Sequence, residues 1–113
     1  DIISSDVHTL SVDGPAYDLL HTMSKLVNCG LSLEDVIAMA TDRPARATGR
    51  DDRGHMSPGT PADITLLEEV HRPFTFTDVE GHSREGAFLF ATRGSFVGGV
   101  FREPLPRPFE TQR

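Results

Sequence analysis

Hydrophobic side chains recur every three or four residues between positions 16 and 28, which is the spacing of one face of a helix. They are Ala16, Leu19, Leu20, Met23, Leu26 and Val27. Gly30 follows this run, and glycine readily adopts the left-handed conformation in which many helices end. The pattern therefore predicts a helix over residues 16–28.

Two shorter helices are predicted before residue 50. Ser32 is a favourable N-cap for an apolar run over residues 33–41. Pro44 is tolerated at the first position of a helix, and Gly49 suits the end of one, so residues 44–48 are expected to form a third helix.

The hydrophobic period changes after residue 50 from that of helices to that of strands separated by Pro and Gly. Four strands are predicted, at Ile64–Leu67, Phe74–Val79, Ala87–Ala91 and Phe96–Phe101. Gly98 and Gly99 lie inside the last pattern and indicate a bulge or a tight bend. The prolines of the tail, Pro104, Pro106 and Pro108, favour an extended segment.

The chain opens on a short apolar run. Ile2 and Ile3 are β-branched, and polar residues follow directly, so residues 1–5 are predicted to form a buried strand with Asp6 at its carboxyl end. A polar stretch that ends in Gly14 is expected to be a loop. Because no methionine precedes the apolar run, we expect the natural protein to extend upstream.

Composition and charge exclude several kinds of partner. The 113 residues include 17 acidic and 11 basic side chains, a net charge of -6, with no basic cluster, so nucleic acid is not an expected partner. No apolar run approaches the ~20 residues that cross a bilayer, and no signal region opens the chain. The single Cys29 cannot form a disulfide within the chain, and together these features predict a cytoplasmic protein.

Asp6 is the best candidate for chemistry from local sequence, because barrel enzymes place catalytic groups at the carboxyl ends of buried strands. The alternative is a loop aspartate that caps a backbone amide, and His8 has a similar alternative as a hydrogen-bonded loop residue. The other histidines, His21, His55, His71 and His82, match no compact metal-ligand spacing and are mostly expected to be solvated. Cys29 and the serines lack the sequence context of a nucleophile.

Four segments, taken in order, resemble the end of the amidohydrolase superfamily. They are SSDVHT at 4–9, SLEDVIAMATDRPARATG at 32–49, GHMSPGTPADITLLE at 54–68 and SFVGGVF at 95–101. SSDVHT and HTMSK at 21–25 are most similar to the dihydroorotase-like amidohydrolase/deacetylase branch. The resemblance implies an α/β protein in which residues 1–50 are the last strand of a metal-dependent (β/α)8 (TIM) barrel with its helices. Residues 51–113 would then be the later strands of a small β-sandwich with a Pro-rich tail.

The resemblance also implies a function for the loop after the first strand. Asp6 matches the family's aspartate that touches the metal and accepts a proton from bound water, while His8 by its side chain and Gly14 by its backbone would hold the substrate. The expected reaction is hydrolysis of an amide or cyclic amide C–N bond in a small molecule, with one or two divalent ions, of which zinc is the expected one.

The remaining metal ligands of the family have no counterpart among these residues, and a catalytic zinc needs about three protein ligands. We therefore expect the isolated chain to be inactive and an N-terminal barrel portion to complete it. The strand at Ile2 and Ile3 is expected to need neighbouring strands, and a set of helix residues is expected to need cover from a barrel: Leu20, Met23, Val27, Val36 and Ile37. We therefore also predict self-association through exposed strand edges, as in a homo-oligomer. Two alternatives are a non-catalytic interaction module and an unrelated small enzyme that uses Asp6 with His8.

Overall fold

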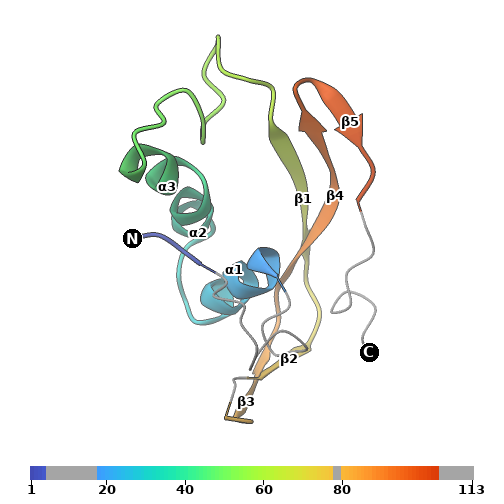
Figure 1. The fold of residues 1–113 in the computed structure, drawn as a ribbon. Helices are drawn as coiled ribbons and strands as arrows, with labels where there is room; N and C mark the ends of the chain where they lie inside the picture. Colours follow the sequence, from blue (N-terminus) through green and yellow to red (C-terminus); the bar gives the residue numbers. More distant parts are fainter. Residues whose placement is uncertain (5–17, 78–79, 105–113) are drawn as a thin grey trace.

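The computed structural model describes residues 1–4, 18–77 and 80–104 of the chain. Three helices come first and five strands follow (Figure 1). The helices are α1 Leu19–Asn28, α2 Leu33–Ala40 and α3 Asp42–Ala47, and the strands are β1 Ile64–Val70, β2 Phe74–Thr77, β3 Ser83–Gly86, β4 Leu89–Val97 and β5 Val100–Arg102. The predicted change from helices to strands near residue 50 is confirmed for the described residues.

The helices begin and end where local chemistry favours it. The Asp18 side chain accepts a hydrogen bond from the His21 N–H and so caps α1, which begins at Leu19; residues 16 and 17 of the predicted helix lie outside the described residues. Ser32 caps α2 through the Asp35 N–H, as predicted. Gly30, between the two helices, has a φ of 104° and so uses a conformation that costs other residues energy.

The third helix begins two residues earlier than predicted. It spans Asp42–Ala47 instead of 44–48, so Pro44 occupies the third helical position. Proline is tolerated there because the N–H groups of the first turn have no intrahelical partner. Asp42 places a carboxylate in the first turn, where it interacts favourably with the helix dipole.

The predicted strand over residues 1–5 is not found in residues 1–4, which belong to no sheet. The Ile3 N–H instead donates to the carbonyl oxygen of Met39, at 3.0 Å, near the end of α2. A strand requires a neighbouring strand for its ladder, and the described residues offer Ile3 a helix end. Residue 5 lies outside the described residues.

The strands form two antiparallel sheets. One contains three strands in the order β1-β4-β5, and the other pairs β2 with β3. The register of β1 against β4 shifts between Leu66 and Leu67, whose partners are Gly94 and Thr92, so Arg93 is the extra residue of a bulge. β3, which sequence patterning missed, consists of Ser83–Gly86 and has no alternating hydrophobic pattern; its pairing with β2 makes it a strand.

The boundaries of the two strands predicted over 87–91 and 96–101 are wrong. A single strand, β4, runs through Leu89–Val97, and the chain reverses at Gly98 and Gly99 into β5. Both glycines have positive φ, 57° and 82°, as a two-residue hairpin turn of the favoured twist requires. The tight bend predicted at these glycines is confirmed, and it determines where β4 ends.

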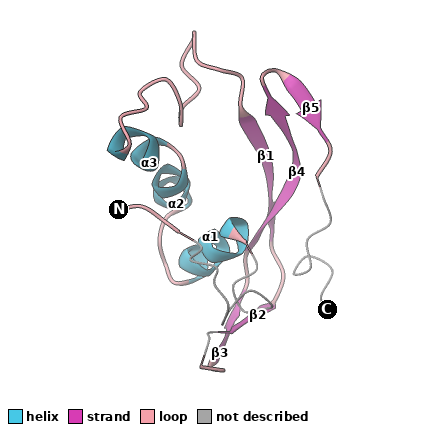
Figure 2. Ribbon diagram, viewed as in Figure 1, coloured by secondary structure: helices cyan, strands magenta, loops and turns pink. Residues whose placement is uncertain are grey.

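The core lies where the helices meet the sheet (Figure 2). Met23 and Val36 are buried against Phe88 and Phe90, and a second small cluster joins Phe74 and Phe76 to Leu89. The expectation that the helix faces need cover from outside the chain is therefore wrong for Met23 and Val36, because the chain's own aromatic residues cover them. Leu20, Val27 and Ile37 pack against the same core and are half-buried. Phe88 and Phe90 also pack edge to face, with ring centroids 4.8 Å apart.

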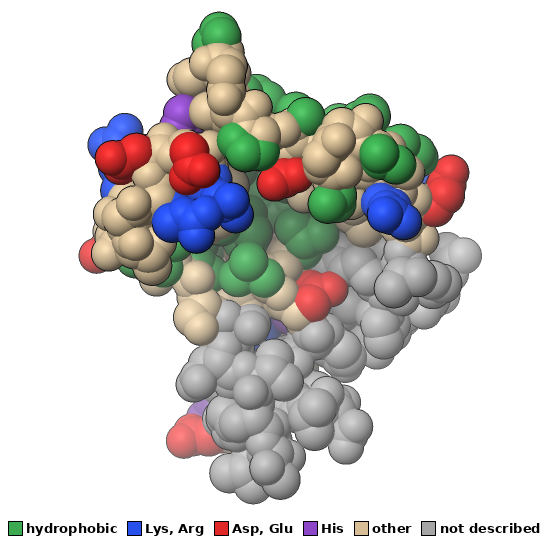
Figure 3. All heavy atoms as spheres, turned by 45° about the horizontal axis from the view of Figure 1, so that its top comes forward, with side chains coloured by type: hydrophobic (Ala, Val, Ile, Leu, Met, Phe, Trp, Pro, Cys, Tyr) green, Lys and Arg blue, Asp and Glu red, His purple; other side chains and the backbone are tan. Residues whose placement is uncertain are grey.

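The described residues make a small α/β structure in which helices lie on one side of the three-stranded sheet (Figure 1). They include neither a closed barrel nor a helix long and apolar enough to cross a membrane. The division at residue 50 and the barrel and sandwich assignments stay predictions. Acidic and basic side chains lie side by side on the face shown in Figure 3, consistent with the absence of a basic cluster in the sequence.

Candidate functional site

The predicted site residues Asp6, His8 and Gly14 lie within residues 5–17, outside the described residues. The structure does, however, place both ends of this segment. On one side, Ile3 is anchored by its hydrogen bond to Met39 and by packing against the main core. On the other side, the segment leads directly to Asp18, the N-cap of α1. The segment thus starts beside the end of α2 and returns to the start of α1.

Asp18 fixes the return of this segment. Its Oδ1 accepts the His21 N–H at 2.8 Å, and its backbone oxygen accepts the N–H of Thr22 at 3.2 Å and the Thr22 hydroxyl at 3.3 Å. A carboxylate at this position also interacts favourably with the positive end of the helix dipole. Asp18 is therefore held in place by hydrogen bonds at the start of α1, and its sequence signal is the acidic residue directly before an apolar helical run.

His21 is the histidine for which the expectation of solvation is wrong. It is only 1% exposed, and its ring centroid is 5.4 Å from that of Phe76. It lies on the same helix face as Ser24 and Asn28, three and seven residues later, which is the face that packs against the sheet. His55, His71 and His82 are exposed, as predicted.

Two polar side chains of α1 bind the backbone of the segment that leads into β4. Asn28 Oδ1 accepts the N–H groups of Ala87 (2.8 Å) and Phe88 (3.1 Å), and its Nδ2 donates to the Phe88 oxygen at 2.7 Å. Ser24 Oγ accepts the N–H of Phe90 at 2.9 Å and donates to the Leu20 oxygen at 2.7 Å. This side-chain clasp, formed by Ser24 and Asn28, holds α1 against the segment that leads into β4.

Gly86 allows this close approach. A Cβ atom at Gly86 would lie 2.6 Å from Asn28 Cγ and 2.6 Å from Phe76 Cε2. Sequence patterning did not find the clasp, because Ser24 and Asn28 look like ordinary polar positions of an amphipathic helix. Their spacing of four residues on a face that also carries Met23 and Leu20 was the available signal.

Two cavities border the helices. The first, of about 300 Å³, lies between the C-terminal half of α1 and the β2–β3 hairpin, with Lys25, Phe76 and Arg84 among its lining residues. The second, of about 480 Å³, is polar and lies beside α3 and the loop after it. Its lining residues are Asp42, Arg46, Asp51, Arg53, His55 and Ser57.

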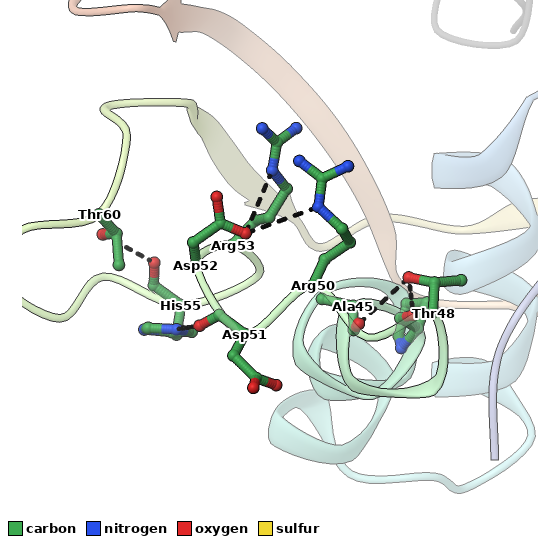
Figure 4. A network of polar contacts seen from close by, with 9 residues as sticks. Ala45, Thr48, Arg50, Asp51, Asp52, Arg53, His55 and Thr60 are labelled. Carbon is green, nitrogen blue, oxygen red and sulfur yellow. Dashed lines mark hydrogen bonds and ion pairs between the residues drawn. The ribbon is translucent and has the colours of Figure 1, made fainter.

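The loop at the second cavity is held by its own polar contacts (Figure 4). Asp52 Oδ1 lies 3.6 Å from the Nε atoms of both Arg50 and Arg53. His55 Nε2 is 2.7 Å from the backbone oxygen of Asp51. Gly54 has a φ of 81°, and a Cβ there would lie 2.5 Å from the Thr41 oxygen. These contacts explain the loop as a structural connection between α3 and β1.

The described residues alone do not fit a metal site. Within ranges 1–4, 18–77 and 80–104, no group of three or more His, Cys, Asp or Glu side chains could hold an ion. Cys29 is exposed at the C-cap of α1, and its described polar contact is with Arg84, whose Nη1 is 3.9 Å from Sγ. Asp6, the one metal ligand that the sequence predicts, lies in the segment that the structure does not describe.

Comparison with known proteins identifies related sequences and folds. The sequence model of the "Amidohydrolase family" matches residues 21–101. A deacetylase of Brucella anthropi is 33% identical over 96 residues, which are 85% of this chain and 24% of the relative. A dihydroorotase crystal structure superposes with a TM-score of 0.81 at 30% identity, covering 90% of this chain and 28% of that one. An adenine deaminase structure superposes with a TM-score of 0.78 at 28% identity, covering 81% of this chain and 25% of that one. The chain thus spans only about a quarter of the length of these proteins.

Proposed function

Because the chain belongs to the amidohydrolase family, we propose that it is the C-terminal portion of a metal-dependent hydrolase that cleaves C–N bonds. The observation that carries this proposal is the family match over residues 21–101. The relatives named deacetylase, dihydroorotase and adenine deaminase support it, since each name denotes hydrolysis at a C–N bond. The proposed substrate is a small molecule with an amide or a cyclic amide.

Asp6 is the proposed proton carrier. As general base it takes a proton from the attacking water, and as general acid it delivers that proton to the leaving nitrogen. The segment that carries it lies between Ile3 and Asp18 in the sequence, and both of these residues form hydrogen bonds with helix ends. His8 and Gly14, in the same segment, are proposed to bind the substrate, His8 through its ring and Gly14 through its backbone.

We propose that residues beyond these 113 supply most of the metal site and the rest of the barrel. The described residues form no site for an ion, and Asp6 alone offers one carboxylate where about three ligands are needed. Zinc, a homo-oligomeric state and a cytoplasmic location stay predictions. The 113-residue chain by itself is expected to show neither amide hydrolysis nor stoichiometric zinc binding.

The test is an Asp6→Asn substitution in a longer protein that contains this chain and hydrolyses an amide or cyclic amide. Turnover should fall by about 100- to 10,000-fold, because proton transfer contributes a factor of that size, while the fold is retained. Asp52→Asn is the matched control, since Asp52 lies in the exposed loop beside α3. Turnover within twofold of the unmodified enzyme in Asp6→Asn would remove Asp6 from the mechanism.

A further inference from the structure

The cavity between α1 and the β2–β3 hairpin has firmly held walls. Lys25 Nζ donates to the backbone oxygen of Thr77 at 3.1 Å, which joins the helix to the end of β2. At the other end of the hairpin, Asn28 Oδ1 accepts the N–H of Ala87 at 2.8 Å, directly after β3. The cavity of about 300 Å³ is therefore formed by two elements that side-chain hydrogen bonds hold together, and its volume is at the lower end of small-molecule sites.

The lining combines an aromatic surface with positive charge. Phe76 is buried and lines the cavity together with the Arg84 guanidinium and the Glu85 carboxylate. His82, also in the lining, is 3.8 Å from Glu80.

Arg84 is the side chain best placed to bind an anion. It is exposed, and among the described residues its guanidinium has no carboxylate within ion-pair distance; its polar contact is the Cys29 thiol, at 3.9 Å. Sulfur is a weak acceptor, so this contact leaves most of the five guanidinium N–H groups available. A guanidinium recognises a carboxylate through two parallel hydrogen bonds.

We propose that this cavity binds a small organic carboxylate with an apolar body. The carboxylate pairs with Arg84, and the apolar body lies against Phe76. Binding at this cavity does not rest on the hydrolytic function proposed above. Its ligand is identified by chemistry alone, as a monocarboxylate small enough for a cavity of about 300 Å³.

Benzoate is a suitable probe, because it joins a carboxylate to one aromatic ring. Titration of the 113-residue chain, followed by NMR, should give saturable shifts at residues of α1 and the β2–β3 hairpin. Benzamide, which has the same shape without the charge, and acetate, which lacks the ring, should each bind at least about tenfold more weakly. Equal binding of benzoate and benzamide would overturn the proposal, whatever the behaviour of any variant.

Arg84→Gln should weaken benzoate binding by about tenfold or more, since one charge-assisted pair is lost. Arg43→Gln is the matched control, because Arg43 lies on α3 beside Asp35, and it should leave benzoate binding unchanged. Unchanged affinity in Arg84→Gln, equal weakening in both variants, or shifts outside the cavity would each contradict the assignment.

Discussion

Two regions of this small structure differ in how well their apolar side chains are covered. One is the junction of α1 with β4, and the other is the β4–β5 hairpin. At the junction, Phe90 is 1% exposed and the polar clasp satisfies backbone groups of the adjacent strand. At the hairpin, Val100 is 58% exposed and Phe101 44% exposed. The first region is covered by the chain's own residues, whereas the second presents apolar side chains to solvent. Contact with a further chain segment or a partner would therefore bury apolar surface at the hairpin.

The largest expected effect concerns this difference in burial. Phe90→Ala should lower the free energy of unfolding by about 3 to 5 kcal/mol, because it removes a fully buried ring and leaves a cavity. Phe101→Ala, the matched control at the hairpin, should cost about 1 to 2 kcal/mol, since the ring of Phe101 covers Gly94 but stays half exposed. Urea denaturation followed by circular dichroism measures both changes. Equal losses would show that the two regions do not differ in the way their burial indicates.

The second prediction tests the clasp. Asn28→Ala should lower the free energy of unfolding by about 1 to 3 kcal/mol, because the N–H groups of Ala87 and Phe88 lose their described acceptor. Thr22→Ala is a control on the same helix, since the described hydrogen bond of the Thr22 hydroxyl is to the backbone oxygen of Asp18, the N-cap of α1. It should cost less than about 1 kcal/mol. A small effect of Asn28→Ala would mean that water satisfies these amides equally well.

The sequence predicted the helices well, because the residues that favour the start and the end of a helix lie within a few positions of it. Ser32 caps α2 as its sequence position indicates, and Gly30 has the left-handed conformation expected after a helix. The strand boundaries were harder. β3 has no hydrophobic alternation and becomes a strand only through pairing with β2, a tertiary effect that a pattern of single residues does not contain.

Some parts of the candidate site could also be predicted from the sequence, and other parts could not. Asp6 could be proposed because its type and its place in a motif are visible in the sequence. The burial of His21 and the hydrogen bonds of Asn28 depend on which helix face meets β4, and the polar residues of that face gave no clear sign of it. The same holds for the cavity beside Arg84, whose lining comes from residues up to 60 positions apart in the chain.

The smallest expected effect on stability concerns the outer edge of the sheet. Among the described strands, β5 pairs only with β4, so no described strand covers its other edge, and its side chains Val100 and Phe101 are exposed. Such edges pair readily with other chains, and lysine on an edge opposes this. Val100→Lys should therefore change the free energy of unfolding by no more than about 0.5 kcal/mol, yet reduce self-association, as measured by sedimentation velocity over a concentration series.

The control for this edge is Met56→Lys, which adds the same charge in the loop before β1, where Met56 is exposed away from the sheet. Each substitution brings the net charge of -6 closer to zero, and a smaller net charge by itself promotes association. Reduced association in Val100→Lys alone would thus go against the general charge effect and locate the contact at β5. If the unmodified chain is a stable monomer at every concentration, the edge is satisfied within the chain and the prediction of self-association is wrong.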